Sequence, residues 1–192
     1  NNTVYHDAGE SIRQSSFHVL SITSTSGFAA ADFDLWPDFS KMILLLLMFF
    51  GACAGSTAGG IKIIRLLLVF KIIRKELYRL IHPKAVIATR IGDKTISDET
   101  LHNTAGFLFL YLAIFLVSTI ILLAQGIDML SSVSAVATAL NNVGPGLGLV
   151  GPTRNFSILS DFSKGLLSVL MLLGRLEIHT LFILISPGFW KR

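Results

Sequence analysis

Charged side chains are scarce in this sequence, and cysteine is almost absent. Asp, Glu, Lys and Arg make up 15% of the 192 residues, whereas a soluble domain usually carries about 25%. Hydrophobic residues make up 52%, and the mean hydropathy is +0.68. The lone Cys53 excludes a disulfide framework, or a zinc site of several thiolates, within the chain. This composition excludes an ordinary soluble domain and indicates an all-α membrane protein.

Three segments are long and apolar enough to cross a bilayer. Residues 105–127 contain no charged side chain and match the roughly twenty apolar residues that a membrane-spanning helix needs. Residues 41–70 and 164–186 are also long enough, but each is interrupted by small or charged residues. Residues 1–14 are polar and lack the apolar core of a cleavable signal peptide. We therefore expect about three membrane-spanning helices.

The net charge of +4 is unevenly distributed along the chain. A run of basic residues separates the first and second spans: Lys71, Arg74, Lys75, Arg79, Lys84, Arg90 and Lys94. The loops on the other side carry Asp32, Asp34, Asp38, Arg154 and Asp161. Because cytoplasmic loops of membrane proteins carry an excess of Lys and Arg, we expect residues 71–100 to form a cytoplasmic loop and not a nucleic-acid-binding surface.

A motif of two parts occurs twice in the chain. The sequence Asp-Phe-Ser-Lys stands at 38–41 and again at 161–164, and Leu-Met-x-x-Gly stands at 47–51 and again at 170–174. Internal repetition of this kind indicates repeated structural units. The unit includes the start of the first span and the start of the last.

A short helix is predicted upstream of each copy, at 9–22 and at 131–140. Segments too short to span, lying beside full spans, are candidates for re-entrant helices that enter the bilayer and return. Each is followed by a turn of small residues: Thr25, Ser26, Gly27 and Phe28 in the first unit, and Asn142, Val143, Gly144 and Pro145 in the second. Glycine permits left-handed backbone, so successive carbonyls can face a pore axis and replace the water around a cation. The partial negative charge of the helix C-terminus favours cations over anions.

The first span is interrupted where a continuous apolar helix would be expected. Residues 51–60 are rich in Gly and Ser, and each Gly destabilises a helix by roughly 1 kcal/mol relative to Ala. A break or an extended loop inside the membrane could obstruct a pore and act as its gate. Alternatively, the spacing of Gly51, Gly55 and Gly59 fits a small-residue packing face on an unbroken helix.

The last span carries three ionisable residues, Arg175, Glu177 and His179. Charges at membrane depth are costly and normally face a bundle interior or a wet cavity. Arg175 could set a barrier in a cation pathway or interact with the interrupted segment. An ion pair between helices, without a role in permeation, is the alternative.

Together these features resemble the Trk/Ktr/HKT superfamily of cation transporters, and most closely its TrkH type of potassium uptake subunit. That family has four repeats of span, pore helix, filter turn and span, folded like potassium channel subunits around one pore. The chain resembles the C-terminal part of such a subunit, from the third pore loop onward. The resemblance implies a third repeat without its first span at 1–70, a basic loop at 71–100 and a fourth repeat at 101–192.

The resemblance also implies roles for individual residues. The two turns would be filter segments: Thr25, Ser26, Gly27, Phe28, Asn142, Val143, Gly144 and Pro145. The gate would consist of Gly55, Ser56, Thr57, Ala58, Gly59, Gly60 and Arg175. Gly at both filter positions is the potassium-favouring pattern, while sodium-permeable relatives differ at a first filter that this chain lacks. Potassium would be the substrate, held by backbone carbonyls, with no bound cofactor and no catalysed reaction.

The partners and the location are likewise implied by the resemblance. We expect a multi-pass protein of the bacterial inner membrane that contacts lipid, forms a homodimer and binds a cytosolic TrkA-like nucleotide-binding subunit, with a cytoplasmic C-terminus. Because two repeats and one span are missing, we expect a fragment or part of a split subunit that works with those missing repeats. Two other classes of function remain open: an intramembrane enzyme using Cys53, or Glu177 with His179, and a non-conducting scaffold.

Overall fold

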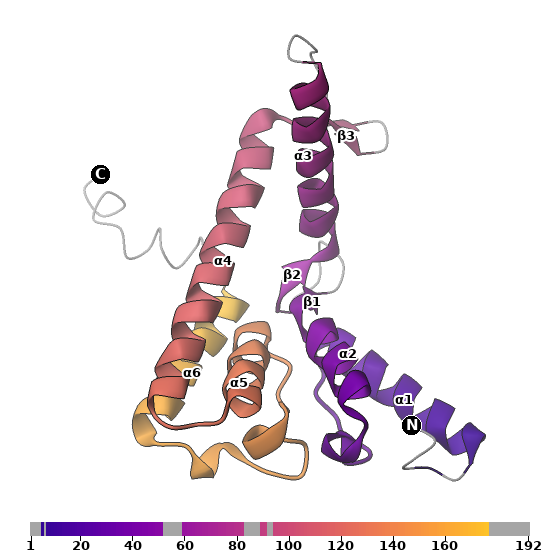
Figure 1. Ribbon diagram of the computed structural model, residues 1–192, viewed down its shortest axis with the longest axis vertical. Coiled ribbons are helices and arrows are strands. Elements are labelled where there is room, and N and C mark those ends of the chain that lie inside the picture. The colour runs from indigo at the N-terminus through magenta and orange to yellow at the C-terminus, as the bar shows by residue number, and fades with distance from the viewer. Residues whose placement is uncertain (1–4, 6, 52–58, 83–88, 92–93, 177–192) are drawn as a thin grey trace.

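The computed structural model describes residues 5, 7–51, 59–82, 89–91 and 94–176, and these are mostly helical (Figure 1). The α-helices are α1 (Ala8–Thr23), α2 (Asp38–Phe49), α3 (Ile63–Ile81), α4 (Asp98–Ala124), α5 (Met129–Asn141) and α6 (Asp161–Arg175). The strands are β1 (Phe50–Gly51), β2 (Ile61–Lys62), β3 (Arg90–Ile91) and β4 (Lys94–Thr95), and the short 3-10 helices are η1 (Phe33–Leu35), η2 (Gly148–Val150) and η3 (Phe156–Ile158). The predicted all-α membrane architecture is confirmed.

Both predicted short helices are present, as α1 and α5. Each begins at an aspartate whose carboxylate accepts a hydrogen bond from a backbone N–H of the first turn: Asp7 from Gly9 at 3.3 Å, and Asp128 from Ser131 at 3.0 Å. Such caps satisfy N–H groups that have no partner inside a helix. The two short helices therefore begin at residues whose side chains favour a helix start.

The first span is broken, as the run of glycines predicted. Helix α2 ends at Phe49, β1 pairs in parallel with β2, and α3 begins at Ile63. A Cβ placed on Gly51 would lie 2.6 Å from the Gly59 oxygen, so the two strands approach too closely for a side chain at this position. The alternative of an unbroken packing helix is wrong, although residues 52–58 lie outside the described part of the chain.

The basic segment predicted as a loop at 71–100 is helical over its first part, because α3 continues to Ile81. Beyond it, the strands β3 and β4 form a short antiparallel pair. Lys75 on α3 pairs with Asp98 at the start of α4 at 2.6 Å. Long basic side chains can keep their charge in water while their stems cover apolar surface, which allows the helix to extend beyond the apolar span.

Helix α4 is the one helix among the described residues that is long and apolar enough to cross a membrane by itself. It corresponds to the predicted span at 105–127 but begins earlier, at Asp98, where the Ser97 side chain caps it. Helix α6 covers only the first part of the predicted span at 164–186, since residues 177–192 lie outside the described part.

Helix α5 lies at the centre of the packing. One hydrophobic cluster joins it to α4 and α6, and a second joins it to α2 and the end of α1. Small side chains on α5, including Ala135, Ala137 and Ala139, are almost fully buried. Because these side chains are short, neighbouring elements can approach the helix from several directions.

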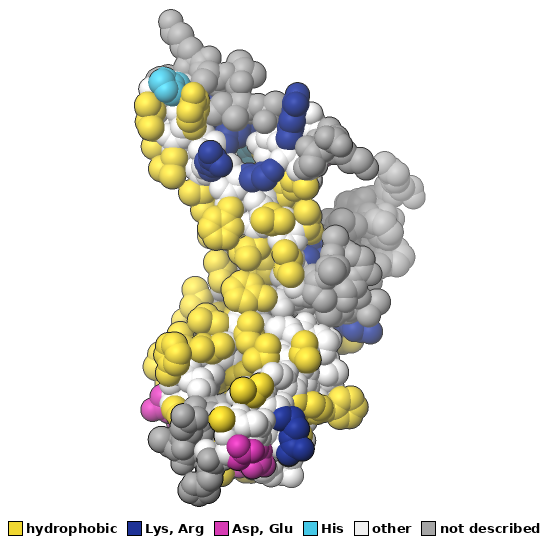
Figure 2. Space-filling view, turned by 90° about the vertical axis from the view of Figure 1, so that its right-hand side faces the viewer, with side chains coloured by type: hydrophobic (Ala, Val, Ile, Leu, Met, Phe, Trp, Pro, Cys, Tyr) yellow, Lys and Arg dark blue, Asp and Glu magenta, His cyan; other side chains and the backbone are white. Residues whose placement is uncertain are grey.

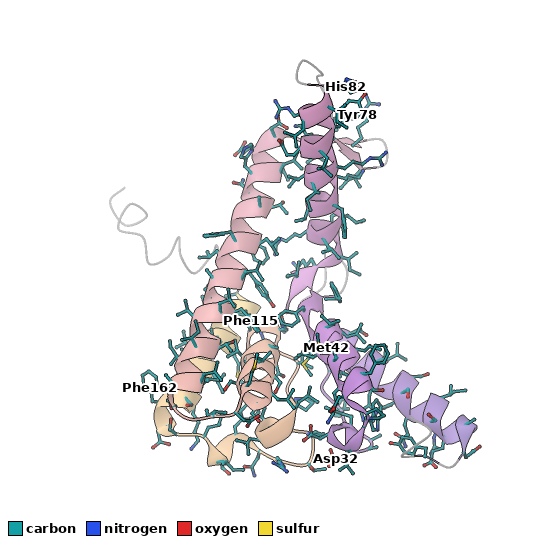
Figure 3. All side chains as sticks on the ribbon, viewed as in Figure 1. Asp32, Met42, Tyr78, His82, Phe115 and Phe162 are labelled. Carbon is teal, nitrogen blue, oxygen red and sulfur yellow. The ribbon has the colours of Figure 1, made fainter. Side chains whose placement is uncertain are left out.

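Charged side chains gather toward the two ends of the molecule (Figure 2). Figure 2 shows Lys and Arg side chains near the end where α3 finishes, both acidic and basic side chains near the other end, and hydrophobic side chains over the face between them. In Figure 3, Asp32 lies at the end opposite to Tyr78 and His82. The apolar surface in Figure 2 therefore lies between two ends that carry the charged side chains.

Candidate functional site

The two short helices end in the same backbone motif. In α1, the N–H of Ser26 donates to the Ser21 oxygen at 3.0 Å, and the N–H of Thr25 donates to the Ile22 oxygen at 3.1 Å. In α5, the N–H of Val143 donates to the Thr138 oxygen at 3.0 Å, and the N–H of Asn142 to the Ala139 oxygen at 3.3 Å. This pattern is the Schellman motif, which ends a helix at a left-handed residue.

Left-handed backbone follows at matching positions in both turns. Thr25 and Asn142 each have φ of 55°, and two residues later Gly27 has φ of 73° and Gly144 has φ of 111°. The glycines fulfil the prediction of left-handed turns, whereas Thr25 is a β-branched residue in a conformation that such residues rarely adopt. Strained backbone of this kind is concentrated at functional sites.

The two turns lie side by side, although they are far apart in the sequence. A Cβ on Gly27 would lie 2.2 Å from the Val143 oxygen and 3.1 Å from Pro145 Cδ, and a Cβ on Gly144 would lie 3.9 Å from the Gly27 Cα. The backbone of Gly27 therefore contacts the backbone of the second turn, and any side chain at Gly27 would displace the second turn. The structure brings the two predicted filter turns together.

Side-chain hydroxyls on one face of α5 hold the chain that follows the second turn. Thr138 accepts from the Gly144 N–H at 2.8 Å, Ser134 from the Leu147 N–H at 3.0 Å, and Ser131 from the Leu149 N–H at 2.8 Å. The three residues are spaced by three and four positions, so they share a helix face. This supporting role was not predicted from the sequence, although the helical spacing of the three residues indicates it.

The first unit uses a similar support with different residues. The Ser21 hydroxyl donates to the Phe28 oxygen at 2.7 Å. One helical turn earlier, the fully buried His18 accepts at Nε2 from the N–H groups of Ala30 and Ala31, at 3.3 and 3.4 Å. His18 was not predicted as a site residue, because a single His on a helix gives no signal of this contact.

A carboxylate joins the outer loops of the two units. The Gly148 N–H lies 3.0 and 3.1 Å from the two Asp34 carboxylate oxygens, across 114 positions of sequence. A second link runs from the Thr153 hydroxyl to the Asp32 carboxylate at 3.1 Å. Asp34 and Asp32 therefore link the loop that follows the first turn to the loop that follows the second.

The C-terminal end of α5 contacts the two segments that contain the predicted gate residues. A Cβ on Gly59 would lie 2.2 Å from the Asn141 oxygen, and a Cβ on Gly174 would lie 1.9 Å from the Leu140 oxygen. Arg175 follows Gly174 at the end of α6 and is exposed in the described structure. Of the predicted gate, Gly59, Gly60 and Arg175 are described, whereas residues 55–58 lie outside the described part, as do Cys53, Glu177 and His179.

The chemistry available at the turns is that of neutral oxygen ligands. Among the described residues, no group of three or more His, Cys, Asp or Glu side chains is placed to hold a metal ion. The turn residues carry backbone carbonyls, the hydroxyls of Thr25 and Ser26 and the Asn142 amide as their polar groups. The C-terminal ends of α1 and α5, each carrying partial negative charge, point toward them.

The chain is similar to known transport proteins over nearly all of its length. Residues 4–191 match the family model TrkH, described as a cation transport protein. The Trk system potassium uptake protein TrkH of Escherichia coli strain K12 is 41% identical over 190 residues, which cover 99% of this chain. The TrkH protein of Vibrio parahaemolyticus is 43% identical over 187 residues, and Escherichia coli TrkG is 37% identical over 186.

A solved structure agrees with these relatives. The crystal structure of the potassium transporter TrkH from Vibrio parahaemolyticus matches with a TM-score of 0.87 and 42% identity, over 98% of this chain and 40% of that one. The chain spans 39% of the length of the Escherichia coli TrkH relative. With the family model matching residues 4–191 and the paired filter-like turns in place, this chain belongs to the TrkH family of cation transport proteins.

Proposed function

We propose that the chain contributes two neighbouring sides of a potassium-selective pore in a membrane transporter. The observation that supports this most is the contact between Gly27 and the turn formed by Val143, Gly144 and Pro145. Two turns with the same left-handed positions meet at their backbones, which is how neighbouring segments of a filter around one axis would meet. The relatives named as potassium uptake proteins support the same assignment.

In this proposal the filter residues act through their backbone. Positive φ at Thr25 and Gly27, on either side of Ser26, would let successive carbonyls face one side. Those carbonyls would replace the water shell of K⁺. The packing of α5 fixes its position, and its hydroxyls hold the backbone from Gly144 to Leu149. The carbonyl oxygens of the second turn would therefore be pre-positioned, and ion entry would need little reorganisation of the protein.

The gate and the partners remain proposals of the same account. Gly59 and Gly174, the residue before Arg175, lie against the C-terminal end of α5 next to the second filter turn. A movement of either segment would therefore change the packing at that turn. We also propose that the protein lies in the inner membrane, with the basic end of α3 in the cytoplasm. It would form a homodimer, work with the missing repeats and bind the TrkA-like cytosolic subunit. We propose no catalysed reaction and no cofactor.

A chimera tests the proposed function directly. Residues 1–192 would replace the matching segment of the Escherichia coli TrkH relative, and the chimera would be expressed in cells that lack other potassium uptake systems. Growth at limiting potassium, together with potassium flux into proteoliposomes, is expected. The unmodified relative and an empty vector are the controls. A chimera that reaches the membrane at the relative's level yet passes no potassium would contradict the proposal.

The same chimera separates the alternatives. Equal sodium and potassium fluxes would favour the sodium-permeable relative, and dimerisation without flux would favour a scaffold. Hydrolytic activity that is lost on blocking the Cys53 thiol would favour the intramembrane enzyme.

A further inference from the structure

Asn141, the last residue of α5, contacts both α4 and the segment before β2, and the proposed filter mechanism assigns it no role. Its side chain is fully buried and makes hydrogen bonds with both of its polar atoms. The oxygen accepts from the Tyr111 hydroxyl of α4 at 2.6 Å, and the nitrogen donates to the Ala137 oxygen at 2.8 Å. The next residue, Asn142, begins the filter turn. Asn141 is therefore bonded to a neighbouring helix immediately before the backbone becomes left-handed.

The returning strand contacts the same residue from another side. A Cβ on Gly59 would lie 2.2 Å from the Asn141 backbone oxygen, and a Cβ on Gly60 would lie 3.0 Å from its side-chain oxygen. Gly60 has φ of 84°, which also favours glycine. Two successive residues without side chains thus contact Asn141. A Cβ on Gly59 would clash with its backbone, and a Cβ on Gly60 would press against its side-chain oxygen.

The corresponding position in the first unit lacks this arrangement. There Ser24 precedes the left-handed Thr25 and is exposed, and its hydroxyl contacts only nearby residues, the Ser21 oxygen and the Ser26 hydroxyl, each at 3.2 Å. A buried polar pair between two helices is costly if one partner is removed, because the other is left without a hydrogen bond in a medium of low dielectric constant. The pair at Asn141 therefore fixes the geometry of one turn specifically.

We propose that Asn141 is a positioning residue for the second filter turn, held by the Tyr111 hydroxyl on one side and by Gly59 and Gly60 on the other. This inference rests on the proposed function, because it assigns Asn141 an effect on ion selectivity. Asn141 acts through the adjacent backbone and does not itself contact the ion. Disturbing either support should shift the turn and weaken discrimination between potassium and sodium.

The first test removes one hydroxyl. Tyr111→Phe in the chimera should lower the potassium-over-sodium flux ratio about five- to tenfold, the scale of one lost buried hydrogen bond. Tyr78→Phe removes an exposed tyrosine hydroxyl on α3 and should leave the ratio unchanged. Phe107→Leu, in the same hydrophobic cluster as Tyr111, should lower thermal stability without changing the ratio.

The second test alters Gly60, which contacts Asn141 from the segment before β2. Gly60→Ala and Gly126→Ala impose nearly the same backbone strain, since the φ angles are 84° and 82°, but a Cβ on Gly126 meets nothing within 4 Å. Only Gly60→Ala should lower the flux ratio. Unchanged ratios in both Tyr111→Phe and Gly60→Ala, with an unmutated chimera that prefers potassium, would overturn the positioning role alone. An unmutated chimera that does not conduct would overturn the proposed function and this inference together.

Discussion

Two glycines on α6 provide a matched pair that measures how tightly this helix packs under the filter turn. A Cβ on Gly174 would lie 1.9 Å from the Leu140 oxygen and 2.8 Å from the Asn142 side-chain nitrogen, whereas a Cβ on Gly165 meets nothing within 4 Å. Replacing Gly with Ala inside a helix stabilises it by about 0.5–1 kcal/mol. Gly165→Ala should therefore be slightly stabilising.

Gly174→Ala should have the opposite sign. The clash is with backbone that is itself held by α5, so the methyl group forces the helices apart at a cost of about 1–3 kcal/mol or more. We expect the two variants to differ by about 2–4 kcal/mol in stability, measured as loss of the folded chimera on heating in detergent. The Asn142 side chain donates to the Met171 oxygen at 3.2 Å, so Gly174→Ala should also reduce flux selectivity. Equal melting of the two variants would refute the close packing of α6 against the turn.

Two further predictions concern carboxylates. Asp34→Ala should lower stability by about 1–3 kcal/mol, because the Gly148 N–H loses a charged acceptor. Asp38→Ala removes a fully exposed carboxylate that pairs with Lys41 and should cost little in the same melting assay. Burial works to raise the pKa of Asp128, but hydrogen bonds from Ser131 outweigh it, and the net pKa lies below 3.8. Because the pKa of Asp128 is lower in the folded state than in the unfolded state, its ionised carboxylate stabilises the fold at pH values above the unfolded pKa. This stabilisation is lost as the pH falls through the folded pKa. Asp128→Ala should therefore cost about 1 kcal/mol at neutral pH and progressively less in acid, and a difference independent of pH would contradict the assignment.

Sequence alone predicted the elements that depend on local chemistry. Helices α1 and α5 were predicted from stretches too short to span a bilayer that end in turns of small residues, and the break after Phe49 was predicted from the run of glycines. The left-handed conformation of Gly27 and Gly144 follows from the lack of a Cβ. The end of α3 was misplaced, because charge alone does not distinguish a solvated helix from a loop.

The contacts that depend on distant segments were not predictable in this way. Nothing in the sequence pairs Asp34 with Gly148 or Tyr111 with Asn141, since tertiary packing brings these residues together. Thr25 was expected in the turn but not in a left-handed conformation, because its β-branched side chain disfavours one. That conformation is imposed by the Schellman hydrogen bonds and by the surrounding packing.

The potassium-over-sodium flux ratio of glycine-to-serine variants tests the central claim most directly. In the chimera, Gly27→Ser and Gly144→Ser should each lower the ratio, because both glycines have positive φ, and Gly27→Ser should lower it more, because its Cβ also meets the Val143 oxygen. Gly106→Ser, on α4 with nothing within 4 Å of its Cβ, is the control and should leave the ratio unchanged. Unchanged ratios for both turn variants would contradict the assignment of the two turns as adjoining sides of a potassium filter.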